Sequence, residues 1–198
     1  MKVAFGIKAH SGWAAMVVVG ERGCGFEIVD RQRMELVDEL WAKAPYHAAE
    51  EMEPGRARKL VERGVRSAHR ITTREMGLAA KRESQRNNDL VACAVLTGAP
   101  MPFWSTDEIR AVHFRMHQAE GALFRDSLMA AAAACHIRSL GIPEKTVIEE
   151  AARIFGVSKD EIERMLAGMG KLAGPPWARD QKNAALAAMI ALRAAQSR

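Results

Sequence analysis

The apolar segment Asp89–Leu96 (DLVACAVL) constrains the fold of this chain more than any other part of the sequence. It has the length of a β-strand, and its apolar residues do not alternate with polar ones, which is typical of a strand covered on both faces. Segments of helix-forming composition flank it, one over residues 54–86 and one that begins at a capping box at Ser105 and reaches about Ala134. A buried strand between two helices predicts helical crossovers and parallel strand pairs.

The residues before Pro54 favour strands joined by tight turns. Short apolar pieces separated by turn-forming residues predict a three-stranded antiparallel meander, in which the third strand is interrupted. These pieces are Val3–Ile7, Trp13–Val19, Phe26–Val29 and Met34–Val37.

The C-terminal part continues the alternation of strands and helices. Cys135–Ile142 (CHIRSLGI) predicts a fifth strand, a second capping box at Ser158 begins a short helix, and an alanine-rich helix after Trp177 reaches about Gln196. We therefore expect one α/β domain over residues 1–198, with a meander followed by alternating helices and strands in one mixed five-stranded sheet.

The composition excludes several classes of protein. With 48% hydrophobic and 27% charged residues, the chain is not expected to be disordered. No stretch approaches the ~18 uninterrupted apolar residues of a membrane helix, and the N-terminus lacks the pattern of a signal peptide. Cys24, Cys93 and Cys135 form no close pair, so we expect reduced thiols, a cytoplasmic location and no membrane partner.

The order of elements resembles that of the ribonuclease H-like superfamily, which includes Holliday-junction resolvases, transposases and integrases. Residues 3–19 look like the first two strands and their turn. Residues 175–192 (PPWARDQKNAALAAMIAL) look like the last resolvase helix, in which an acid precedes an alanine-rich run. The chain also resembles a bacterial family that carries the motifs HSGWA, PYH and PPW. The first resemblance implies a nucleic-acid partner and divalent metal ions held by carboxylates.

Most of the acids implied by this resemblance are missing. The superfamily places acids at the ends of the first and fourth strands, where this chain reads Gly6-Ile7-Lys8 and Leu96-Thr97-Gly98. Only Asp180, before the last apolar run, matches. Two Mg²⁺ or Mn²⁺ ions need several converging carboxylates, because hard cations prefer oxygen ligands. We therefore expect the catalytic centre to be degenerate or rebuilt, as in a pseudo-nuclease.

Residues with catalytic chemistry remain near the expected site. His10 and Ser11, in the turn after the first strand, can act as base and nucleophile or hold an anion, although a polar hairpin turn is the simpler interpretation. Asp180 would be the surviving acid and Lys182 an anion contact, whereas an acid at a helix start also complements the helix dipole. Asp30 is expected at the same sheet edge, in the cluster Asp30–Arg33 that separates the two β pieces. Glu120 is expected to lie around the same site.

The segment that follows Ser105 contains one candidate metal site. His113, His117 and Glu120 fall within roughly 60° of arc on a helix, so two imidazoles and a carboxylate can share a divalent metal. The same residues border an apolar stripe, where half-buried polar residues are ordinary. Pro45–His47 contains the only tyrosine of the chain and is expected in the loop before the helix over residues 54–86. A turn with a capping role is the simpler interpretation of this motif.

Positive charge gathers on one predicted helix. Residues 54–90 contain ten Lys or Arg against four Asp or Glu, which gives the segment a net charge of +6. This is more than the net charge of +5 of the whole chain. Six of the cations lie within about 80° of arc, at a spacing that can follow the phosphates of DNA or RNA. They are Lys59, Arg63, Arg66, Arg70, Arg74 and Lys81. A solvated face of an amphipathic helix is the alternative interpretation.

These observations favour a nucleic-acid-associated ribonuclease H-like protein with a degenerate or rebuilt catalytic centre. The sequence contains no Walker A, GxGxxG, CxxC pair, HExxH or GxSxG motif, which argues against a P-loop enzyme or a zinc ribbon. Two alternatives stay open. One is a non-enzymatic interaction or scaffold protein whose basic stripe meets an acidic partner. The other is a metal-dependent hydrolase that uses His113, His117 and Glu120.

Overall fold

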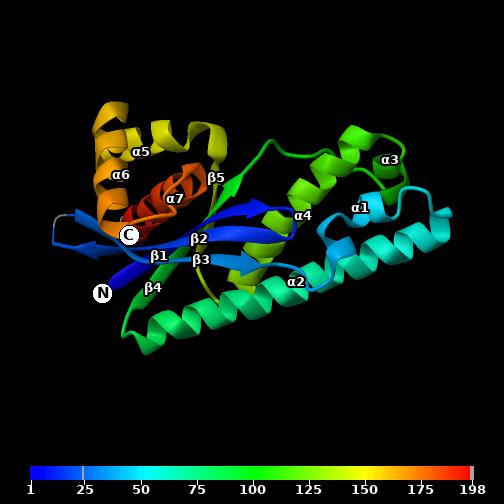
Figure 1. The fold of residues 1–198 in the computed structure, drawn as a ribbon, viewed down its shortest axis with the longest axis horizontal. Helices are drawn as coiled ribbons and strands as arrows, with labels where there is room; N and C mark the ends of the chain where they lie inside the picture. Colours follow the sequence, from blue (N-terminus) through cyan, green and yellow to red (C-terminus); the bar gives the residue numbers. More distant parts are fainter. Residues whose placement is uncertain (24, 197–198) are drawn as a thin grey trace.

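A mixed sheet with strand order β3-β2-β1-β4-β5 forms the centre of the computed structural model, which describes residues 1–23 and 25–196 (Figure 1). The first three strands form an antiparallel meander, and β1, β4 and β5 run parallel. The strands are β1 (Lys2–His10), β2 (Trp13–Arg22), β3 (Gly25–Glu35), β4 (Asp89–Thr97) and β5 (Ser139–Pro143). The predicted α/β class with one mixed five-stranded sheet is confirmed.

Helices cover both faces of this sheet. One face packs against α2 (Pro54–Gln85) and α4 (His113–Ala134), and the other against α5 (Val147–Phe155), α6 (Lys159–Ala173) and α7 (Arg179–Gln196). The short elements are η1 (Leu40–Lys43), α1 (Pro45–Ala48), α3 (Thr106–Arg110) and η2 (Glu144–Thr146). Figure 1 shows that α2 and α4 reach past the end of the sheet, where α1 and α3 join them.

Strand alternation divides the core into two layers. Phe5 and Ile7 of β1 pack into the layer with α2 and α4, whereas Ala4 packs into the layer with α7. Helix α7 lies unusually close to β1, because Gly6 has no side chain: a Cβ at this position would come within 1.8 Å of the Ala184 carbonyl oxygen. The alanine-rich sequence of α7 therefore permits a close helix–strand contact.

The third strand is continuous, which corrects the prediction of two pieces separated by Asp30–Arg33. Its polar residues alternate between the faces of an edge strand. On one face, Asp30 accepts a hydrogen bond from Arg86, and Gln32 accepts one from Arg82, both near the end of α2. On the other face, Arg31 donates to the loop before α7. Because an edge strand is only half-covered, polar residues on both faces find partners or solvent.

The helix predicted from Ser105 to about Ala134 is instead two helices, α3 and α4. The capping box at Ser105 is present, but Val112 adopts an extended backbone (φ −139°, ψ 113°) and starts a new helix at His113. Apolar residues on both sides of the break, Ile109 and Met116, pack into one cluster. The apolar residues therefore keep helical spacing on both sides of Val112, so their periodicity does not indicate that the helix breaks there.

The fifth strand begins at Ser139 rather than at Cys135. The intervening residues end α4: His136 has a left-handed backbone (φ 58°) and Ile137 N–H donates to the carbonyl of Ala132. This is the hydrogen-bond pattern of a Schellman helix end, which uses apolar residues that also suit a strand. Helix α5 was not predicted, although its apolar residues Val147, Ala151 and Ile154 have helical spacing. Pro45–His47 begins a short helix rather than lying in a loop.

None of the described helices is long and apolar enough to cross a membrane. Cys93 is buried and Cys135 is half-buried, and both are free thiols. Cys24 lies outside the described residues.

Candidate functional site

Polar side chains gather where β1 and β5 end, on the face of the sheet that packs against α7. Lys8 and His10 alternate with apolar residues of β1 and share the face of Gly6. Lys8 Nζ forms an ion pair with Glu144, which directly follows β5, and the two side chains are only 19% and 22% exposed. We call Lys8, His10, Glu144, Asp180 and Asn183 the β1-end site.

Glu144 is held as a carboxylate by its neighbours. Burial favours its neutral form, but the hydrogen bond and charge of Lys8 outweigh burial, with smaller contributions from Asn183 and Arg179, so that the pKa of Glu144 lies below its ordinary value. The Asn183 side-chain amide donates to the other carboxylate oxygen at 3.4 Å. The ion pair thus links β1, β5 and the first turns of α7.

His10 connects the same site to the start of α7. Its Nε2 lies 2.9 Å from the Asp180 carboxylate, and each side chain is 31% exposed. The imidazole stacks on Trp13 with ring centroids 4.2 Å apart, and the Arg33 guanidinium lies over the same indole at 3.9 Å. The imidazole of His10 is therefore held between a carboxylate and an aromatic ring.

A groove of about 850 Å³ opens beside the β1-end site. Lys182, Arg179 and Arg164 contribute positive charge to its lining, and Glu144 and Asp160 contribute negative charge. The groove therefore mixes both signs of charge rather than presenting one.

The β1-end site does not fit two divalent metal ions. Its carboxylates are Glu144 and Asp180, and each already contacts a basic group, Lys8 or His10. Lys8 also brings a positive charge to the strand end where the resemblance implies an aspartate. Over residues 1–23 and 25–196, no three carboxylates converge as a metal-ligand group. A pair of hard cations needs more negative oxygen ligands than this donor set provides.

The structure brings together only part of the predicted shared site. His10 contacts Asp180, Ser11 follows His10 in the exposed turn, and Lys182 lines the adjoining groove. Asp30 does not join them, because strand alternation directs it to the α2 face, where Arg86 binds it at 2.9 Å. Glu120 also lies elsewhere, in the N-terminal half of α4, where its carboxylate contacts His47.

Sequence reasoning missed Glu144 and Asn183 as members of this site. Glu144 is the residue after β5, and parallel strands end at the same edge, so a correct strand end would have indicated it. Asn183 lies three residues after Asp180 in α7, which places both on one side of the helix.

A second cluster contains the residues predicted to hold a metal. His113 Nε2 and His117 Nε2 lie 3.1 Å apart on α4. His47 of α1, which sequence reasoning did not include, joins them, with ring centroids 5.0 Å from His113 and 4.5 Å from His117. Glu120 is buried and is not part of this group of three; its carboxylate accepts hydrogen bonds from His47 Nδ1 and from the His47 and Tyr46 N–H groups.

The six predicted nucleic-acid contacts lie on the exposed side of α2, which we call the cationic face. Three of its arginines have acidic neighbours: Arg66 lies 3.7 Å from Glu62, Arg70 lies 3.1 Å from Asp38 and Arg74 lies 2.8 Å from Glu75. The Arg63 guanidinium lies over the Trp41 ring at 4.3 Å. The helix predicted from residue 54 is confirmed, and its cations point away from the sheet.

Comparison with solved structures identifies the fold as ribonuclease H-like. The Thermus thermophilus RuvC structure matches with a TM-score of 0.55 and 14% sequence identity, covering 98% of this chain and 96% of that chain. T. thermophilus RuvC in complex with a Holliday junction substrate matches with a TM-score of 0.52 and 14% identity, covering 96% and 91%. No protein-family model and no curated protein matches this sequence.

Proposed function

We propose that this chain binds the phosphate backbone of nucleic acid through the cationic face of α2, without a two-metal nuclease centre. The observation that carries the proposal is the row of six exposed cations on one side of a helix of 32 residues. Regularly spaced cations contact phosphates without reading base sequence. The fold it shares with RuvC, one structure of which contains a Holliday junction substrate, supports the same partner class.

The acidic neighbours of the cationic face do not prevent such binding. Exposed ion pairs contribute only about 0–1 kcal/mol each, so phosphates can replace Glu62, Asp38 and Glu75 at small energetic cost. Arg63, stacked on Trp41, is already ordered and loses less freedom on binding than a free side chain.

The β1-end site supports the part of the proposal that excludes metal-dependent cleavage. Lys8 neutralises Glu144 and His10 engages Asp180, so neither carboxylate is free to hold a divalent cation. We therefore expect no Mg²⁺- or Mn²⁺-dependent cleavage of duplex or four-way-junction DNA.

Fluorescence anisotropy with labelled duplex DNA, four-way-junction DNA and duplex RNA tests the proposal. Three to six phosphate contacts predict a slope of about −3 to −5 for log K against log salt concentration. Reversing Arg63, Arg66 and Arg70 to glutamate is expected to abolish binding. A matched control reverses three exposed cations of α5 and α6 (Arg153, Lys159 and Lys171) and makes the same change in net charge.

The control separates a specific surface from general charge. Equal loss of binding in both triple variants, or no binding of the unaltered chain at low salt, would overturn the proposal. Binding of an acidic polypeptide but of no nucleic acid would instead favour the interaction-protein alternative.

A further inference from the structure

Three histidines from two distant segments converge beyond the end of the sheet. His47 belongs to α1, and His113 and His117 are one turn apart at the start of α4. One ring nitrogen from each lies within 4.8 Å of the others. In the part of the chain that the structure describes, this is the only group of three or more histidine, cysteine or acidic residues with such spacing.

His47 is oriented as a metal ligand. Its Nδ1 lies 2.8 Å and 2.9 Å from the two oxygens of the Glu120 carboxylate, which can only accept a hydrogen bond. Nδ1 therefore carries the proton, and the lone pair lies on Nε2. That Nε2 is buried and has no hydrogen-bond partner among the described residues. A buried polar atom without a partner destabilises the fold by about 1–3 kcal/mol, unless a ligand satisfies it.

The two α4 histidines have the spacing that a tetrahedral ion requires. With zinc–nitrogen bonds of about 2.0–2.1 Å, two ligand nitrogens on a tetrahedron lie about 3.3 Å apart. The Nε2 atoms of His113 and His117 lie 3.1 Å apart. The other ring nitrogen of His113 lies 4.0 Å from the Glu50 carboxylate, which is near enough for charge attraction but too far for a hydrogen bond. A carboxylate in hydrogen-bond contact with the second ring nitrogen, as Glu120 is with His47, orients a metal-ligating histidine.

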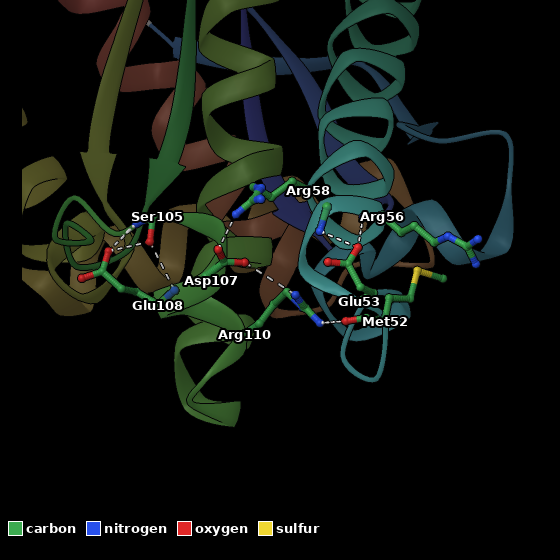
Figure 2. Close-up of polar contacts among 9 residues, drawn as sticks. Met52, Glu53, Arg56, Arg58, Ser105, Asp107, Glu108 and Arg110 are labelled. Carbon is green, nitrogen blue, oxygen red and sulfur yellow. Dashed lines mark hydrogen bonds and ion pairs between the residues drawn. The ribbon is translucent and has the colours of Figure 1, made fainter.

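Neighbouring contacts hold the contributing segments in place. Glu120 accepts the N–H groups of Tyr46 and His47 and thereby fixes α1 to α4. The guanidinium of Arg110 donates to the Glu50 and Met52 carbonyls. Figure 2 shows Arg110 joining Met52 to Asp107, and Asp107 binding Arg58 of α2. The histidines are therefore arranged before any ligand arrives.

We propose that His47 Nε2, His113 Nε2 and His117 Nε2 bind one transition-metal ion of the Zn²⁺ class. Glu120 positions His47 and is not itself a ligand. Three imidazoles suit Zn²⁺, Cu²⁺ or Ni²⁺, whereas Mg²⁺ and Ca²⁺ prefer oxygen. His113 and His117 are exposed, and His117 also lines a hollow of about 270 Å³ with Arg125, so a water or an anionic group can complete the coordination. The site shares no residue with the cationic face, and the proposal does not depend on nucleic-acid binding.

Titration of the full chain without a histidine tag tests the site. Zn²⁺ is added in competition with a chromophoric chelator, and Co²⁺ is added as a spectroscopic probe. We expect one tightly bound equivalent of Zn²⁺, an intense visible Co²⁺ spectrum of tetrahedral type, and a higher melting temperature with Zn²⁺. His47→Ala and His113→Ala are each expected to weaken Zn²⁺ binding by at least about 100-fold, and Glu120→Gln by about 10- to 100-fold.

A distant histidine provides the matched control. His136 is exposed at the end of α4, and His136→Asn suits its left-handed backbone, so its Zn²⁺ affinity is expected to equal that of the unaltered chain. His113 is 65% exposed, so His113→Ala remains informative even if His47→Ala fails to fold. Unchanged affinity in His113→Ala, or a pale octahedral Co²⁺ spectrum in the unaltered chain, would overturn the proposal.

Discussion

Lys8 and Glu144 form an ion pair that joins the ends of β1 and β5 across the strand between them. Both side chains are about four-fifths buried, so their charges are only weakly screened by solvent. A lysine of the chain therefore supplies the positive charge at a strand end where a ribonuclease H-like nuclease is expected to hold metal ions. This pair determines both the electrostatics and the stability of the β1-end site.

Removing the lysine charge is expected to destabilise the fold. Lys8→Met keeps most of the side-chain volume but leaves the Glu144 carboxylate without its cation, so we expect a loss of about 1–3 kcal/mol in the free energy of unfolding. Glu144→Gln and the double variant complete a double-mutant cycle, measured by urea denaturation at pH 7. A coupling energy of at least about 0.5 kcal/mol is expected, and strictly additive effects would contradict a direct interaction.

The same pair predicts how stability depends on pH. The pKa of Glu144 is lower in the folded chain than its ordinary value of 4.5, because the hydrogen bond and charge of Lys8 outweigh the opposing effect of burial. Its contribution is therefore complete above pH 4.5 and is lost as the pH falls through the folded pKa. The stability difference between the unaltered chain and Glu144→Gln should shrink over that range. If the stability difference between the two proteins grew on acidification, the pKa of Glu144 would be raised rather than lowered by folding, and this account would be contradicted.

Sequence patterns predicted the order of the strands and two helix starts because these signals are local. The apolar run of β4, the glycine turns of the meander and the capping boxes at Ser105 and Ser158 each act within a few residues. The break at Val112 and the helix end at His136 were missed because they use residues that fit the surrounding pattern. Both follow from backbone geometry that the apolar periodicity does not encode.

The candidate sites were only partly predictable because they combine residues far apart in the chain. His113 and His117 share one helix, so their spacing reveals them, but His47 joins them from a segment 66 residues earlier than His113. In the same way, Lys8 meets Glu144 only once β5 is placed beside β4. Helical and strand periodicity describe one element at a time and do not encode such encounters.

Arg31 is expected to hold the loop before α7. Its guanidinium donates to three carbonyls, those of Ala173 and Pro176 at 2.6 Å and of Gly174 at 2.8 Å. Arg31→Ala removes charge-assisted hydrogen bonds and is expected to lower the free energy of unfolding by about 2–3 kcal/mol, with faster hydrogen exchange in residues 173–178. Arg31→Lys should recover only part of the loss, because an ammonium lacks the planar fork. Full recovery by lysine would contradict this account.

The contact between β1 and α7 depends on the missing side chain of Gly6. A Cβ there would lie 1.8 Å from the Ala184 carbonyl oxygen and 2.7 Å from the Ala188 nitrogen, both backbone atoms that cannot rotate away. We expect Gly6→Ala to destabilise the fold by about 3 kcal/mol or more, measured by urea denaturation. Gly168→Ala is the matched control, because no atom lies within 4 Å of its added Cβ in the exposed middle of α6. It is expected to stabilise the chain by about 0.5–1 kcal/mol, since alanine favours a helix more than glycine does. If both substitutions had the same effect on the free energy of unfolding, the close approach of β1 and α7 would not require glycine at position 6.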